Sequence, residues 1–248
     1  MTVARWARIQ TEMRILAVDT STLAEGVALI EPDRILCDLQ VDVRSSHAPH
    51  LLGLIHQALA LASAPLASID AFAASQGPGS FTGLRIGIAT LLGLAQALNR
   101  RVLGIDTLEA LALKVPFAAQ PVCALLDARK GEVFGAIFRP TTNGLLRLTP
   151  NLVMTPEAFC ANITEPTILL GTGVEVYRHV WQTQLGERAI LAPPWLGMPC
   201  SVQVGALALA QAAAGQHGPT GTLSPTYVRP SEAEINWSRH RPDDLSPI

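Results

Sequence analysis

The sequence predicts an α/β protein built from two related lobes. Short apolar runs alternate with segments of helical spacing along the first half of the chain. An apolar run that ends in an acid occurs twice, at residues 15–19 and 122–127. Of the 248 residues, 49% are hydrophobic and only 15% are charged, against about 25% charged in ordinary domains. Much of the chain must therefore be buried inside itself or against a partner.

The first half predicts three strands, a helix, a strand, a helix and a strand. Two apolar runs flank the hydroxyl-bearing residues Thr20, Ser21 and Thr22, which is typical of a β-hairpin with a polar tip. The predicted strands cover residues 15–19, 26–30, 35–43, 69–75 and 101–105, and the predicted helices cover 47–62 and 81–99.

The second half begins the same pattern again. Strands are predicted at 122–127 and 132–138, and Asp127 follows Asp19 by 108 residues. This spacing suggests a degenerate internal duplication, although hairpins with an acid at the tip are common and leave the matter open. We expect a first lobe at 13–115 to which a helix at 204–214 returns, a reduced second lobe at 116–203, and a tail at 215–248 that is loosely held after Tyr227.

Charge and apolar patterning exclude several classes of protein. The formal net charge of −2 excludes a strongly basic scaffold that binds nucleic acid by charge alone. The longest apolar stretch, 86–98, is interrupted and is expected to be too short for a bilayer, and residues 1–12 lack a signal-peptide core. The four cysteines form no C-x-x-C pair. We therefore expect a cytoplasmic protein with no membrane segment and with reduced, buried thiols.

A glycine-rich turn at 75–83 (SQGPGSFTG) is the strongest local motif. Glycines allow a tight turn, Ser80 or Thr82 can cap the following helix, and the free N–H groups would attract phosphate or carboxylate. An unliganded turn fits equally well, and the P-loop pattern is absent. The Asp19 carboxylate, beside the hydroxyls of residues 20–22, could likewise hold a magnesium-bound phosphate, or it could simply order its own turn. The predicted weak phosphate half-site consists of Asp19, Thr20, Ser21, Gly77, Gly79 and Ser80.

The histidines and the second helix point to a protein surface and not to a metal. His47, His50 and His56 lack the spacing of a helical zinc pair, and no Ser/His/Asp or Cys/His arrangement is supported, so no metal site and no catalytic residue are predicted. The helix at 81–99 carries an apolar stripe and small residues on its other faces, which favours burial on two sides, one of them against another chain, although the stripe could be core alone. The predicted partner interface is His47, His50, Leu51, Leu54, Gly83, Gly87, Leu91 and Leu92.

Four motifs together resemble the TsaB (YeaZ) family, whose bacterial members are needed to make threonylcarbamoyladenosine at position 37 of tRNA. They are RILAVDTST at 14–22, GPGSFTGLRIG at 77–87, DARKGEVF at 127–134 and PTYVR at 225–229. The resemblance runs in family order from about residue 13 to residue 229. It implies the two-lobed fold shared by actin, hexokinase and sugar kinases, with duplicated mixed-sheet lobes.

The resemblance also implies a non-catalytic role. Family members assist a paralogue, TsaD, which transfers the threonylcarbamoyl group to tRNA and carries an H-x-x-x-H metal motif. Thr107 and Leu111 stand at the positions of the two histidines here, so the resemblance implies that the metal site is lost. The implied partners are the TsaD-type paralogue, a TsaE-type ATPase in a larger complex, tRNA through that complex, and a second copy of this chain when it is alone.

Nucleotide binding is expected to be weak. Kinases of this fold grip phosphate from two hairpins, but the second hairpin here, 127–130, lacks the hydroxyls, while 171–173 resembles the turn that meets adenosine. We expect no tightly bound cofactor, with weak ATP or ADP binding at most, or only within the complex. Residues 1–12 precede the usual family start and are expected to be a disordered arm or a misassigned start. A sugar-kinase-like phosphotransferase and a glycoprotease-type metallopeptidase are the alternative functions.

Overall fold

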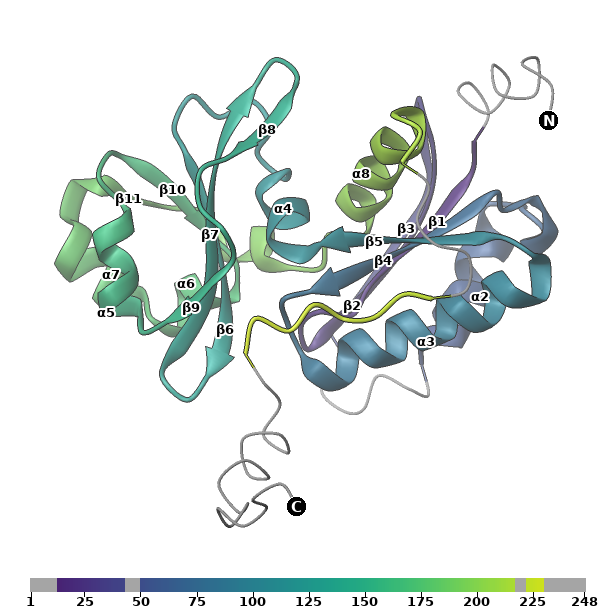
Figure 1. Ribbon diagram of the computed structural model, residues 1–248, viewed down its shortest axis with the longest axis horizontal. Helices are drawn as coiled ribbons and strands as arrows, with labels where there is room; N and C mark the ends of the chain where they lie inside the picture. The colour runs from purple at the N-terminus through teal and green to yellow at the C-terminus, as the bar shows by residue number, and fades with distance from the viewer. Residues whose placement is uncertain (1–12, 43–49, 217–221, 230–248) are drawn as a thin grey trace, which may run out of the picture.

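The computed structural model describes residues 13–42, 50–216 and 222–229 as two α/β lobes, each built on one mixed β-sheet (Figure 1). Helices cover both faces of each sheet, and α4 and α8 lie between the two sheets (Figure 1). The central strands are therefore buried on both faces. All five residues of β1 are buried, which explains why its first four are apolar.

The first lobe holds a five-stranded sheet in the order β3-β2-β1-β4-β5. β1 pairs antiparallel with β2 and parallel with β4, so the predicted hairpin with a polar tip is confirmed. The elements are β1 (Ile15–Asp19), β2 (Ala24–Glu31), β3 (Arg34–Asp42), α2 (Leu51–Leu61), η1 (Leu66–Ser68), β4 (Ala71–Gly77), α3 (Phe81–Leu98), β5 (Arg101–Asp106) and α4 (Thr107–Ala112).

The second lobe repeats this topology. Its sheet has the order β8-β7-β6-β10-β11, with β9 added to β7, and its strand directions match those of the first sheet, as the predicted duplication requires. The elements are β6 (Val122–Arg129), β7 (Glu132–Thr141), β8 (Gly144–Arg147), β9 (Leu152–Met154), α5 (Pro156–Phe159), η2 (Cys160–Asn162), β10 (Thr167–Leu170), α6 (Thr172–Val176), α7 (Arg178–Leu185), η3 (Gly186–Arg188), β11 (Ala189–Leu191) and η4 (Pro194–Gly197).

The chain then returns to the first lobe through α8 (Ser201–Ala213), which packs on β1 and β2. Gly205 makes the close approach to the sheet, because a Cβ there would lie 2.6 Å from the Ile30 side chain. One core cluster, to which both sheets and α8 contribute, fills the space between the lobes, and two further clusters lie under the outer helices. The two lobes therefore share a packed interface.

Helix α3 covers one face of the first sheet and buries one side against it. By length and composition alone it could cross a membrane, contrary to our expectation from the apolar stretch, and no other described helix meets that test. Of its predicted stripe, Leu84, Ile88, Leu91 and Ala95 are buried, with at most 3% of any of these side chains exposed, and Leu98 at the end of the helix is half-buried. The reading of this stripe as core is therefore confirmed, and the sheet accounts for its apolar character.

The segment after α8 is held more firmly than predicted. Residues 222–229 run along β4 and α3 and end beside β6 (Figure 1). The expectation of a loosely held chain after Tyr227 is wrong for Val228 and Arg229, because both contact the body of the protein. The rest of the predicted tail lies outside the described residues.

Candidate functional site

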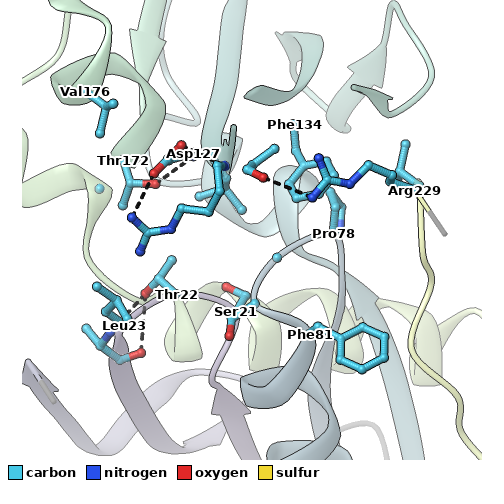
Figure 2. Close-up of a pocket in the computed structure, with 18 of the residues that line it drawn as sticks. Ser21, Thr22, Leu23, Pro78, Phe81, Asp127, Phe134, Thr172, Val176 and Arg229 are labelled. Carbon is cyan, nitrogen blue, oxygen red and sulfur yellow. Dashed lines mark hydrogen bonds and ion pairs between the residues drawn. The ribbon is translucent and has the colours of Figure 1, made fainter. Parts of the chain in front are cut away.

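A cavity of about 660 Å³ lies between the two lobes. Figure 2 shows Ser21, Thr22 and Leu23 of the β1–β2 hairpin on one side, and Asp127 and Thr172 of the second lobe on the other. The glycine turn, α6 and the end of the described chain also contribute to the lining, together with residues of β2, β3, β6 and β7 and with Gly197 and Met198. A volume of this size is within the range of small-molecule sites.

The glycine turn is shaped by contacts within the chain. The backbone N–H of Ser80 donates to the carbonyl of Ser21 at 2.7 Å, and the Ser80 hydroxyl accepts from the N–H of Gly83, which caps α3 as predicted. Gly77 and Gly79 have φ angles of +119° and +157°. A Cβ at Gly79 would lie 2.5 Å from the Ser21 carbonyl oxygen. Gly79 therefore allows the hairpin tip to meet the turn, and Gly77 allows Thr226 to approach, where the sequence left open an approach to a ligand.

Asp19 is buried and turned toward α8. Its Oδ1 accepts from the N–H of Ser21 at 3.0 Å, and its Oδ2 accepts from the N–H of Cys200 at 2.9 Å and from the Cys200 thiol at 3.1 Å. Burial by itself would raise the pKa of Asp19, but these hydrogen bonds outweigh it and hold the pKa below the ordinary value of 3.8. The Asp19 carboxylate is therefore ionised and fully engaged by protein donors.

The predicted phosphate half-site is only half assembled. Ser21, Gly79 and Ser80 line the cavity, whereas Asp19, Thr20 and Gly77 do not. Thr20 donates its hydroxyl to the carbonyl of Gly83. The prediction that Asp19, Thr20 and Gly77 face a phosphate is therefore wrong, because their polar groups serve contacts inside the first lobe.

The second hairpin has a strained turn. Arg129, Lys130 and Gly131 have φ angles of +61°, +55° and +78°. Asp127 accepts from the backbone N–H of Arg129 at 2.9 Å and forms an ion pair with its guanidinium at 3.3 Å. Tyr177 also donates to Asp127, and burial followed by that negative charge raises the pKa of Tyr177. Asp127 is therefore tied to its own turn.

The turn at 171–173 packs closely against β6 and against α4. Gly171 has a φ of +113°, and a Cβ there would lie 2.1 Å from the Leu125 carbonyl oxygen and 2.8 Å from the Leu111 side chain. The Thr172 hydroxyl accepts from the N–H of Asp127. The Thr107 hydroxyl accepts from the N–H of Gly77, and Thr107 and Leu111 are 1% and 2% exposed. No group of three or more His, Cys, Asp or Glu side chains within the described ranges is arranged to hold a metal ion.

The predicted interface residues divide into buried and accessible ones. Leu51, Gly83, Gly87 and Leu91 are buried in the first lobe, so their assignment to a partner surface is wrong. A Cβ at Gly87 would lie 2.4 Å from the Thr20 hydroxyl oxygen, which shows that this glycine serves the fold. His50 is exposed, Leu54 and Leu92 are half-buried, and His47 lies outside the described residues.

Two exposed leucines on α2 were missed by the sequence reasoning. Leu52 is 57% exposed and Leu61 is 64% exposed, although helical spacing placed both on a helix rich in apolar residues. Only the tertiary packing decides which of these leucines faces the sheet. The contacts of residues 222–229 were also missed, because their partners are distant in sequence.

The repeated strand order, the helices between the sheets and the cavity between the lobes define a protein of the actin-like and sugar-kinase-like fold class. A sequence model described as TsaD, tRNA N6-adenosine threonylcarbamoyltransferase, matches residues 42–237. The chain therefore belongs to this family.

Individual relatives are more specific. A protein of Bacillus subtilis named tRNA threonylcarbamoyladenosine biosynthesis protein TsaB is 26% identical over 91% of this chain and 98% of its own length. The Escherichia coli protein of the same name is 37% identical, over 54% of this chain and 58% of its own length. YeaZ from Pseudomonas aeruginosa superposes with a TM-score of 0.75 at 29% identity, covering 87% of this chain and all of that one. The similarity to TsaB (YeaZ) expected from the four motifs is confirmed.

Proposed function

We propose that the chain is a non-catalytic assembly subunit that supports a TsaD-type threonylcarbamoyltransferase in forming N6-threonylcarbamoyladenosine at position 37 of tRNA. The observation that carries this proposal is the similarity to a protein named for threonylcarbamoyladenosine biosynthesis over nearly the full length of both chains. The match to a TsaD family model supports it, because a subunit and a paralogous enzyme that share a fold can pair through related surfaces.

The non-catalytic part of the proposal is supported by two positions on α4. Thr107 and Leu111 stand where the paralogue is expected to carry its metal-binding histidines, and both side chains are buried in contacts with the chain itself. A leucine side chain has no donor atom for a metal. A metallopeptidase activity would require the ligands that these residues replace.

The two hairpin acids argue against a phosphotransferase. Such an enzyme needs a carboxylate that can accept a proton from a substrate hydroxyl or hold magnesium beside the phosphates. Asp19 already accepts from Cys200 and Ser21, and Asp127 is paired with Arg129. We therefore propose weak ATP or ADP binding at most, in the cavity between the lobes or only within the complex.

We propose that the TsaD-type partner contacts the outer face of α2 and α3. Leu52 and Leu61 are more than half exposed there, and the accessible His50, Leu54 and Leu92 lie on the same two helices. Large apolar side chains left exposed on a helix are available to pack against another chain. The same face would serve a homodimer when the partner is absent, while a TsaE-type ATPase and tRNA would join through the larger complex in the cytoplasm.

Co-purification tests the assembly role. The full chain and the TsaD-type paralogue from the same organism are co-expressed, with an affinity tag on the paralogue only, and the eluate is sized by light scattering. We expect a stoichiometric heterodimer. The proposal fails if both proteins are folded and remain separate at micromolar concentrations.

A further inference from the structure

The described end of the chain, residues 222–229, is called the C-terminal strap here. Its first part is fixed to the first lobe by main-chain contacts. The N–H of Thr226 donates to the carbonyl of Gln76 at 2.8 Å, and the Gln76 side-chain amide donates to the carbonyl of Ser224 at 2.8 Å. A Cβ at Gly104 would lie 2.6 Å from the Leu223 side chain, so the strap also packs against β5.

An aromatic contact fixes the next residue to the start of α3. The rings of Tyr227 and Phe81 stack with their centroids 4.8 Å apart, and the Arg85 guanidinium lies 3.8 Å from the centroid of the Phe81 ring. Arg85 Nε also donates to the Tyr227 hydroxyl oxygen at 2.8 Å. A planar guanidinium over a ring and a stacked ring pair each add stability beyond the burial of area. Tyr227 is therefore anchored to the first lobe.

Two residues further on, the strap is bound to the second lobe. Arg229 Nη1 forms an ion pair with Oε2 of Glu132 at 2.7 Å, and Nη2 donates to the carbonyl of Ala128 at 3.5 Å. The Arg229 and Glu132 side chains are 25% and 32% exposed. Val228, between the two anchors, packs against the core cluster that both sheets share. Figure 2 shows Arg229 reaching the cavity from the side opposite Leu23 and Val176.

The strap is thus a third bridge between the lobes. The chain passes from one lobe to the other between α4 and β6, and it returns between η4 and α8. Residues 226–229 line the cavity, so the third bridge closes one side of it. From these contacts we propose that the C-terminal strap is a clasp that holds the two lobes at a fixed angle, and that release of Arg229 from Glu132 lets the lobes move apart. This inference concerns the isolated chain and does not depend on the proposed function.

The distance between the lobes tests the clasp. Spin labels are placed on Gln57→Cys in α2 and Gln184→Cys in α7, both exposed, in a Cys37→Ser background, because the other three cysteines are buried. Distances are measured by pulsed electron resonance in the full chain and in Arg229→Ala, Glu132→Gln and the charge exchange Arg229→Glu with Glu132→Arg. The matched control is Arg139→Ala, which removes a 2.6 Å ion pair to Glu165 that lies within the second lobe.

We expect one narrow distance distribution in the parent and in Arg139→Ala, a broader or longer one in Arg229→Ala and Glu132→Gln, and recovery in the charge exchange. Identical distributions in all five proteins would overturn the proposal.

Amide hydrogen exchange is a second readout that needs no labels. The turn at 128–132 should exchange roughly tenfold faster in Glu132→Gln, because a charge-assisted hydrogen bond is lost. Unchanged exchange at 128–132 in that folded variant would also overturn the clasp.

Discussion

Cys200 donates both its backbone N–H and its thiol to Oδ2 of Asp19, at 2.9 and 3.1 Å, across 181 residues of sequence. The contact joins the tip of the first hairpin to the start of α8, which is the point where the chain re-enters the first lobe. The carboxylate expected to face a phosphate therefore stabilises the fold. Desolvation raises the pKa of the Cys200 thiol well above its ordinary value, so the thiol acts as a donor at neutral pH.

Asp19→Asn should destabilise the protein. The substitution keeps the shape but removes the charge that accepts from Ser21 and Cys200, and buried hydrogen bonds to a charged group are worth about 2–3 kcal/mol each before relaxation. We expect a loss of about 3 kcal/mol in the free energy of unfolding, measured by urea denaturation. Asp33→Asn, at an exposed position of the β2–β3 turn, is the control and should change stability little.

The same residue predicts a pH dependence. The pKa of Asp19 is lower in the folded protein than its ordinary value of 3.8, so its ionised form stabilises the fold above that value. This stabilisation should fall as the pH drops from about 3.8 through the lower folded pKa. The parent should therefore lose stability more steeply than Asp19→Asn in this acid range, as followed by unfolding at a series of pH values. Parallel curves would contradict the assignment.

Two glycines of α3 should respond in opposite directions to alanine. A Cβ at Gly87 would lie 2.4 Å from the Thr20 hydroxyl oxygen, whereas at Gly93 nothing lies within 4 Å. Gly87→Ala should destabilise by about 1–3 kcal/mol through overpacking, and Gly93→Ala should stabilise by about 0.5–1 kcal/mol through helix propensity. Thermal unfolding of both variants measures this. Equal changes in stability for the two variants would mean that Gly87 faces a surface, as the sequence predicts.

The sequence predicts those features of this structure that depend on neighbouring residues, and it does not predict contacts between residues far apart in the chain. The apolar run at residues 15–18 predicts a buried strand, because a strand covered on both faces is mainly apolar. The glycine block predicts that another group comes close to its backbone, but the sequence does not show whether that group is a ligand or Ser21. Arg85 and Tyr227 are 142 residues apart, and no local pattern links them. Leu51 and Leu52 are adjacent leucines of one helix. Packing of α2 against β2 and β3 buries Leu51 and leaves Leu52 exposed, and the sequence alone does not distinguish them.

Leu52→Glu on α2 should separate the chain from the proposed TsaD-type partner without unfolding it. Leu52 is 57% exposed, so a carboxylate there is solvated in the free chain but would be buried and unpaired in a complex. We expect at least tenfold weaker binding by titration calorimetry. Leu146→Glu in the second lobe, at a leucine that is 54% exposed, is the matched control and should bind normally. Normal binding by a folded Leu52→Glu variant would show that Leu52 is not part of the interface.

Nucleotide should bind weakly to the isolated chain. Asp19 and Asp127 are both engaged inside the protein, so neither hairpin acid is free to hold magnesium beside a phosphate. The cavity offers phosphate hydroxyl-bearing residues such as Ser21 and Thr22, backbone groups and two arginines. We expect a Kd for ATP of about 0.1 mM or weaker, which corresponds to about 5.5 kcal/mol or less. Titration calorimetry with ATP and magnesium measures it. A micromolar Kd for ATP would contradict the interpretation that both hairpin acids are engaged inside the protein and not available to nucleotide.

The most direct test of the account is threonylcarbamoyl transfer to tRNA, measured with this chain alone, with the TsaD-type paralogue alone, and with both in the presence of the other components of the pathway. The burial of Thr107 and Leu111 at the positions expected to bind metal predicts no transfer by this chain alone. The proposed assembly role predicts a rate with both proteins well above that of the paralogue alone. Transfer by this chain without the paralogue, or no gain when it is added, would contradict the assignment as a non-catalytic supporting subunit.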